Sequence, residues 1–363
     1  MNDMTSKERI TAALLGETVD RIPWSPFLAY IWETFPASVQ KQGPLAFYDS
    51  IGADPLWRGA PCPVRATISG VTYNTQEAGT LVKTEATTPV GTLTWTHLRS
   101  TEGNTMFLCE HPLKSVEDCK VQLWIEEHTT FTRDMSEVDA HLRNEGREGV
   151  SIGMLLPRGK TSFQQLIEHF IGTEEMAYFL ADTPEAVTDL LAVMVRNDLQ
   201  AATLAMDAPY DFFLTYEDSS TQNYSPRQYA DYIQPEITTI CQLLASAGKR
   251  YVQHACGHVR ELLPKMLESG VAVVESLSPP PTGNITLRDA RAMVGTTMGI
   301  IGGIEPTAFL HTPLAEFPVY VEQVIADGIG GPFVLANSDS CPPGVAIEKF
   351  RMVGDIVRRY PVP

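Results

Sequence analysis

The sequence predicts an α/β fold of the (β/α)8 TIM-barrel class with an inserted antiparallel β-meander. From residue 150 onward, short apolar runs of strand length alternate with longer helical patterns. Most of these runs are apolar throughout, which is typical of parallel strands buried on both faces. With two earlier extended stretches the runs number eight, and no Gly-x-Gly-x-x-Gly pattern follows any of them. The count favours a barrel, and the missing pattern argues against a dinucleotide-binding open sheet.

The chain begins with a helix signal. Residues 5–8, Thr-Ser-Lys-Glu, form a capping-box pattern, and the helix is expected to stop at Gly16. The next segment, 19–27, is predicted to be the first strand, because residues that precede proline avoid the helical backbone. A helix over about 37–51 then leads to an extended stretch at 53–57.

The residue pattern of the sequence changes between about residues 63 and 113. Thr and Val alternate with other residues there, and turn residues recur at short intervals. This pattern predicts antiparallel strands with turns at 77–79 and 89–91. We interpret the region as a β-rich insertion, a flap or partner surface, in a chain that otherwise forms one barrel domain over residues 1–363.

The remaining elements follow in a regular order. Helices are predicted over 115–128 and 135–148, and strand then helix alternate after them. The predicted strands are 150–156, 210–215, 251–254, 271–276, 298–302 and 332–336, and the predicted helices are 184–206, 226–247, 260–269, 287–294, 314–327 and 347–359.

Composition narrows the possible partners. The net charge of −17 disfavours nucleic acid and anionic membrane surfaces, which would repel such a chain. The N-terminal residues lack a basic region followed by an apolar run, and no apolar stretch is long enough to span a bilayer. The six cysteines are scattered without a disulfide-like framework, which fits a reducing compartment. We therefore expect a cytoplasmic protein.

A histidine and two cysteines form the candidate metal site. His254 and Cys256 follow an apolar run, and in an extended strand their side chains would point to the same face. Cys341 follows another such run, and in a barrel the carboxyl ends of all strands meet at the rim that carries the active site. One His and two Cys with an open fourth position suit a catalytic zinc ion. The alternative is that these residues only pack in the core, where free Cys is common.

Other polar residues fall on the same rim. Glu217 and Asp218 follow the run at 210–215, and we expect this pair to orient substrate or to complete the zinc shell. Glu275 and Glu305 also lie at strand ends, although a merely polar strand end is the simpler interpretation for each of them.

Three motifs resemble the uroporphyrinogen decarboxylase superfamily, and the resemblance covers nearly the whole chain. It implies a (β/α)8 barrel and divides into two functional branches. The motifs are Lys-Glu-Arg-Ile-Thr-Ala-Ala-Leu at 7–14 followed by Asp-Arg-Ile-Pro at 20–23, Gly-Gly-Ile-Glu-Pro at 302–306, and Asp-Ser-Cys-Pro-Pro-Gly at 339–344.

The decarboxylase branch uses no metal and holds a many-carboxylate tetrapyrrole with arginines just after the first strand. Residues 22–57 of this chain contain no arginine, and aromatic residues stand there instead. Trp24, Phe27 and Tyr30 are therefore expected to line a substrate or corrin face, with ordinary packing as the alternative.

The other branch comprises corrinoid-dependent methyltransferases. Their zinc motif is His-x-Cys followed much later by Cys, and it is matched by His254, Cys256 and Cys341. The insertion at 88–93 is similar to that of methyltransferase components from O-demethylase systems.

The resemblance implies a zinc-dependent methyltransferase. It would move a methyl group between a methoxy aromatic donor, or a thiol acceptor, and a corrinoid (cobalamin) on a separate corrinoid-binding protein. Two alternatives remain: metal-free decarboxylation of a tetrapyrrole, and a non-enzymatic chain that only scaffolds a corrinoid protein.

Overall fold

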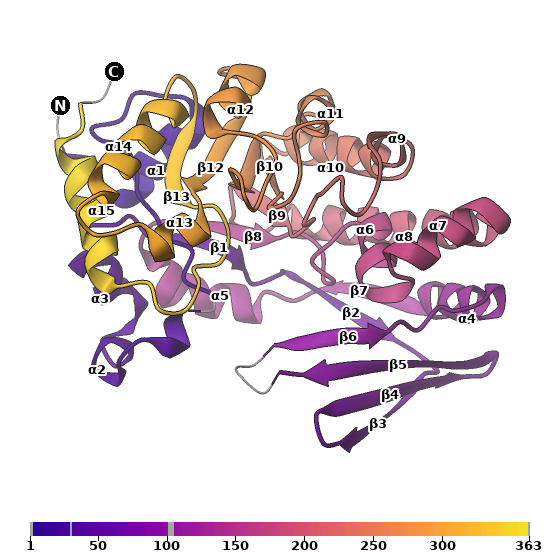
Figure 1. The fold of residues 1–363 in the computed structure, drawn as a ribbon. Helices are drawn as coiled ribbons and strands as arrows, with labels where there is room; N and C mark the ends of the chain where they lie inside the picture. The colour runs from indigo at the N-terminus through magenta and orange to yellow at the C-terminus, as the bar shows by residue number, and fades with distance from the viewer. Residues whose placement is uncertain (1–2, 30, 101–104, 362–363) are drawn as a thin grey trace. The chain divides into compact units, whose positions relative to one another are not determined.

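The chain forms two compact units (Figure 1). The computed structural model describes residues 3–29, 31–100 and 105–361. Unit 1 comprises Met1–Pro63, Met135–Leu155 and Ala208–Pro363, and unit 2 comprises Val64–Asp134 and Leu156–Asp207. The single-domain interpretation of residues 1–363 stays a prediction.

Unit 1 is built on a seven-stranded parallel sheet. Every residue of its last three strands is buried, as expected for parallel strands covered on both faces. Each strand from β8 onward overlaps its predicted range. In spatial order the strands are β1 (Leu56–Ala60), β8 (Val150–Met154), β9 (Phe212–Thr215), β10 (Arg250–His254), β11 (Val273–Leu277), β12 (Gly299–Ile304) and β13 (Phe333–Asn337).

The prediction of a first strand over 19–27 is wrong, so the sheet has seven strands and not eight. Trp24 makes an isolated parallel bridge to Leu335 of β13. Ser25 N donates to Leu335 O over 2.9 Å, and Asp54 N, just before β1, donates to Trp24 O over 2.7 Å. The segment is thus hydrogen-bonded at both edges of the sheet. It cannot extend into a full strand, because the flanking prolines, Pro23 and Pro26, have no N–H to donate.

The helices of unit 1 overlap the predicted ones except for α13, which the sequence interpretation missed. The expected helix at 37–51 is split into α2 (Ala37–Gln40) and α3 (Gly43–Ser50), because Gly43 adopts a left-handed φ of 82°. The helix at 226–247 contains a π-helical stretch at Tyr229–Ile233. The others are α1 (Ser6–Leu15), α5 (Ser136–Arg143), α9 (Pro226–Gln228), α10 (Gln234–Ser246), α11 (Leu263–Ser269), α12 (Leu287–Val294), α13 (Pro306–His311), α14 (Phe317–Gly328) and α15 (Ile347–Arg359).

Unit 2 contains the predicted meander. Figure 1 shows its four antiparallel strands side by side: β3 (Thr72–Ala78), β4 (Leu81–Thr88), β5 (Gly91–Arg99) and β6 (Met106–Glu110). Both predicted turns are confirmed, since Ala78 pairs with Leu81 and Thr88 pairs with Gly91.

The insertion differs from the prediction at its start. β2 (Val64–Ile68) does not join the meander and pairs with β7 (Thr129–Arg133), a Thr-rich strand that the sequence interpretation missed. The helices of unit 2 are α4 (Val116–Glu127), α6 (Ser162–Gln165), α7 (Thr173–Asp182) and α8 (Pro184–Ala205), with a π-helical stretch at Leu166–Phe170. Within the described parts of the chain, no helix is long and apolar enough to cross a membrane.

Helix α1 packs against the sheet of unit 1. Thr5 accepts a hydrogen bond from Glu8 N and the Glu8 carboxylate reaches back to Thr5 N, so the capping box is confirmed. Ile10 and Leu14 belong to the same buried cluster as Val252, Ile301 and Val334 of the strands. The apolar face of the first helix is therefore part of the core of unit 1.

A buried carboxylate connects this helix to the sheet. Asp54, which is fully buried, accepts from Arg9 Nη1 at 2.6 Å and from Arg21 Nη1 at 2.8 Å. It also accepts from Ser6 Oγ at 2.8 Å and from Trp24 N at 3.2 Å. One side chain thus fixes α1, the bridge segment and the entry to β1 relative to one another.

We expect Asp54→Ala to lower the free energy of unfolding by about 3–5 kcal/mol, because it leaves buried arginine charge without its partner. Urea denaturation followed by circular dichroism would measure the loss. Glu117→Ala, in an exposed pair with Lys120, is the control and should change stability far less. Equal stability of the two variants would contradict the structural role of Asp54.

Candidate metal site

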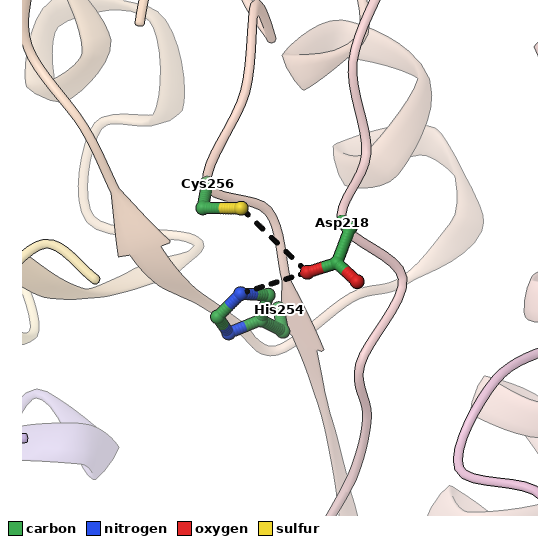
Figure 2. Close-up of side chains that lie close together, drawn as sticks. All are labelled: Asp218, His254 and Cys256. Atoms are coloured by element: carbon green, nitrogen blue, oxygen red, sulfur yellow. Dashed lines mark hydrogen bonds and ion pairs between the residues drawn. The ribbon is translucent and has the colours of Figure 1, made fainter. Parts of the chain in front are cut away.

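Three potential metal ligands converge at the carboxyl ends of β9 and β10. Each of Asp218, His254 and Cys256 offers one atom, and these atoms all lie within 4.8 Å of one another. Figure 2 shows the side chains pointing toward one another. His254 ends β10, and Asp218 follows the neighbouring strand β9, so the parallel pairing of the two strands brings them together.

A buried glutamate orients the imidazole. His254 Nδ1 lies 2.5 Å from Glu275 Oε2. Glu275 belongs to β11 and is the residue that pairs with His254 in the register of β10 and β11. His254 Nε2 lies 3.2 Å from Asp218 Oδ1, which in turn is 3.6 Å from Cys256 Sγ. Metal-bound histidines usually donate their second N–H to a carboxylate in this way. Of the two ring nitrogens of His254, Nε2 therefore faces the other two potential ligands, and Nδ1 faces Glu275.

Glu275 is itself held from two sides. Ser276 Oγ donates to Glu275 Oε1 over 2.9 Å, and Arg58 Nε lies 3.3 Å from the same oxygen. Burial opposes ionisation, but the charges on His254 and Arg58 outweigh it and lower the pKa of Glu275. The carboxylate is thus kept as an anion in a fully buried position.

Negative charge accumulates around the imidazole. Burial lowers the pKa of His254, but Glu275 and the hydrogen bond with Asp218 raise it well above its usual range. Asp339 is also close enough for the His254 charge to lower its pKa, although burial raises that pKa overall. Sulfur, nitrogen and oxygen donors in an acidic, largely buried setting match the ligands that zinc prefers.

Cys341 is not a member of the Asp218, His254 and Cys256 group. Its side chain is fully buried, its N–H donates to Phe27 O over 3.1 Å, and burial raises the pKa of its thiol. The assignment of Cys341 as a zinc ligand stays a prediction.

The two adjacent carboxylates predicted to be catalytic have different surroundings. Asp218 belongs to the ligand group and adopts a left-handed φ of 43°, which is uncommon for a residue other than glycine. Glu217 is fully buried, and burial together with the Glu217 charge raises the pKa of Tyr251. The structure therefore brings Asp218, but not Glu217, into the ligand group.

The aromatic residues predicted to line the substrate face have different surroundings. Trp24 is fully buried and packs edge-on against Phe309 of α13, with ring centroids 6.4 Å apart. The Phe27 ring lies 5.0 Å from the Arg58 guanidinium carbon. Tyr30 lies outside the described residues. The substrate-binding role of these three residues stays a prediction.

Sequence interpretation missed Arg58 and undervalued Glu275. Arg58 is the first residue after the arginine-free stretch 22–57, and its side chain is only 1% exposed. In β1 alternate residues are buried, so an arginine at the inward-facing position 58 was the available signal. The ring of Tyr216, which packs edge-on against His254 at 5.1 Å, was also missed.

The parallel sheet and the ligand group at its strand ends define an α/β protein with a candidate metal site. The sequence matches the family described as Uroporphyrinogen decarboxylase (URO-D) over residues 163–360. The chain therefore belongs to this family. A search of curated proteins found no match.

Two solved structures are similar to this chain. A methyltransferase from Methanosarcina mazei is similar over 98% of this chain and 99% of its own, with a TM-score of 0.63 and 15% sequence identity. A B12-independent methionine synthase from Shewanella sp. W3-18-1 is matched over 95% of this chain and 98% of its own, with a TM-score of 0.47 and 10% identity. At such low identity the first likeness establishes a common fold and nothing finer.

We expect the purified protein to contain about one zinc per chain, and Cys256→Ser to lose most of it, because a hydroxyl replaces a thiolate ligand. Cys341→Ser tests the second predicted thiolate in the same way. Elemental analysis after metal-replete, reducing purification measures the content, and Cys109→Ser, at an exposed cysteine, is the matched control. Absence of zinc from the unsubstituted protein would refute the metal site.

Proposed function

We propose that this chain is a zinc-dependent methyltransferase that exchanges a methyl group with a corrinoid on a separate corrinoid-binding protein. The observation that carries the proposal is the convergence of Asp218, His254 and Cys256, with His254 Nδ1 held by the buried Glu275. Membership of the URO-D family and a fold shared with a protein described as a methyltransferase agree with this class.

The donor set fits the proposed metal. Asp218, His254 and Cys256 would hold zinc, and Cys341 is the further candidate ligand predicted from the sequence. When bound, zinc would act as a Lewis acid toward a methoxy oxygen or lower the pKa of a substrate thiol.

The residues of the chain divide the remaining tasks. Glu275 keeps a proton on His254 Nδ1, so that Nε2 stays available toward Asp218 and Cys256. Ser276 and Arg58 hold Glu275 in place. Asp218 Oδ1 lies beside both Nε2 and the Cys256 sulfur, and in this scheme a substrate oxygen or sulfur would displace this carboxylate from the metal.

The substrate side of the site favours a neutral molecule. Three carboxylates surround His254. Glu275 and Asp218 raise the pKa of the imidazole, and the charge on His254 acts on the pKa of Asp339. The surroundings are therefore acidic. An added substrate carboxylate would have to be desolvated next to these charges at a cost of several kcal/mol. A methoxy aromatic or a small thiol avoids this cost, and the Phe27 ring offers an apolar surface close to Arg58.

Metal-free decarboxylation of a tetrapyrrole is the alternative. It requires cationic side chains for many carboxylates. Arg58 lies beside the site: its Nη2 donates to Ser25 O over 2.9 Å, its Nε lies 3.3 Å from Glu275 Oε1 without forming a hydrogen bond, and its Nη1 finds no acceptor among the described residues. One arginine is too few to neutralise many carboxylates, which supports methyl transfer over decarboxylation.

Corrinoid spectroscopy tests the proposal. The zinc-loaded protein, mixed with cobalamin and a panel of methoxy aromatics and thiols, should change the cobalt absorbance as methyl groups move to or from the corrinoid. Decarboxylation of uroporphyrinogen, with the corrinoid spectrum unchanged across the panel, would refute methyl transfer and favour the alternative.

We further expect Glu275→Gln to reduce activity or zinc affinity by roughly 10–100-fold, because the histidine would lose its charged hydrogen-bond partner. Zinc titration and the corrinoid assay measure the two effects separately. Glu322→Gln, in an exposed pair with Arg359, is the matched control and should leave both unchanged. Wild-type values for Glu275→Gln would exclude an orienting role for this carboxylate.

A further inference from the structure

The side chain of Tyr216 reaches from the end of β9 to β1. Tyr216 directly follows β9, and β8 lies between β9 and β1 in the sheet. A Cβ atom at position 59 of β1 would lie 2.5 Å from the Tyr216 hydroxyl oxygen and 3.1 Å from its ring carbon Cε2. The tip of the tyrosine therefore rests on the backbone of Gly59. Both residues belong to unit 1, as do the three potential metal ligands.

The backbone of β1 makes room for this contact. Gly59 adopts a left-handed φ of 71°, and the pairing of β1 with β8 shifts its register between Arg58 and Ala60. A glycine at such an irregularity often marks the close approach of another group. Because Gly59 has no side chain, the tyrosine hydroxyl can occupy the space beside it. Any larger residue at this position would displace the tyrosine.

The ring of Tyr216 also lies against His254. The two ring centroids are 5.1 Å apart and the ring planes are inclined by 69°, which is an edge-to-face arrangement. His254 is buried, and Tyr216 is half-buried and packs against the core of unit 1. One side chain thus contacts β1 at its tip and the imidazole with its ring.

The imidazole needs more than one contact to be held in a single orientation. The hydrogen bond between Nδ1 and Glu275 selects the tautomer, but hydrogen bonds tolerate a range of angles, and the χ2 angle of histidine has broad minima. A tilt of the ring would move Nε2, which lies 3.2 Å from Asp218 Oδ1. Metal–ligand distances tolerate deviations of only about 0.2 Å. A ring packed against the imidazole limits this tilt.

We propose that Tyr216 is a positioning residue of the metal site and that Gly59 sets the position of Tyr216. Strand β1 then acts on His254 by two routes. Arg58 lies against Glu275, which holds Nδ1. Gly59 seats Tyr216, which holds the plane of the imidazole. The inference rests on the proposed metal site, but it does not depend on methyl transfer.

Tyr216→Leu tests the ring contact. It should weaken zinc binding by about two- to tenfold, the range expected for one edge-to-face contact, whereas Tyr216→Phe keeps the ring and should stay within about twofold of the wild type. Competition with a chromophoric chelator on the full chain measures the affinity. Tyr320→Leu is the matched control, because both tyrosines are half-buried and burial raises the pKa of each to about 12. The Tyr320 hydroxyl accepts from Glu305 N, and neither of these residues belongs to the ligand group.

A double-mutant cycle tests the role of Gly59. Gly59→Ala places a methyl group 2.5 Å from the tyrosine oxygen and should weaken zinc binding, although position 59 lies outside the ligand group. In Tyr216→Phe the hydroxyl is absent and the nearest remaining ring atom is 3.1 Å away. The second substitution should therefore restore much of the lost affinity. Backbone strain at the positive φ is the same in both backgrounds and cancels in the cycle.

Cobalt(II) in the place of zinc reports the geometry of the site, because its visible absorption depends on the arrangement of its ligands. Tyr216→Leu should change the cobalt spectrum, and Tyr320→Leu should leave it as in the wild type. A purely structural contribution of Tyr216 would lower the stability of the fold and leave the spectrum of the folded protein unchanged.

Four outcomes would overturn the inference. These are wild-type zinc affinity in Tyr216→Leu, equal weakening in Tyr216→Leu and Tyr320→Leu, wild-type affinity in Gly59→Ala, and a Gly59→Ala defect that persists undiminished in the Tyr216→Phe background. Failure of the wild type to bind zinc would refute the metal site together with this inference. Zinc binding that depends on Tyr216, with no change of the corrinoid spectrum, would refute methyl transfer and support the inference.

Discussion

The buried Asp54 carboxylate is the interaction on which the rest of unit 1 depends. It accepts hydrogen bonds from the first helix, from Arg21 and from the backbone of Trp24, and it directly precedes β1. The bridge segment at Trp24 therefore stays between the two edges of the sheet although prolines prevent it from forming a strand. Because β1 begins two residues later, the same contacts set the position of Arg58, and through Arg58 that of Glu275.

Local sequence patterns predicted most elements because those elements depend on local physics. Apolar runs located the strands from β8 onward, and the capping box located α1, since burial and capping are encoded within a few residues. The errors concern long-range pairing. Nothing near residues 64–68 or 129–133 indicates that these two strands pair with each other, and the number of strands in the sheet depends on the backbone hydrogen bonds that Leu335 makes with Pro23 and Ser25.

In the candidate site, too, some features follow from local sequence and others depend on long-range pairing. The spacing of His254 and Cys256 was sufficient to predict that they converge, because alternation along an extended segment is a local property. Choosing Asp218 over its neighbour Glu217 required the backbone conformation after β9, and the partnership of His254 with Glu275 required the register of β10 on β11. The features of the candidate site that depend on tautomer and charge are thus encoded in sheet register and not in a motif.

The left-handed backbone at Asp218 restricts how this position can vary in evolution. At a φ of 43° only glycine, asparagine and aspartate are accommodated readily, and of these only aspartate brings an anionic oxygen to His254 and Cys256. Ser276, next to Glu275, also has a positive φ, of 63°. A substitution at these positions next to His254 must therefore satisfy two constraints: it must tolerate the positive φ, and it must keep the chemistry of the site. Homologues that lose the carboxylate at 218 should retain Gly or Asn there, a trace of the lost site that can be read from sequence.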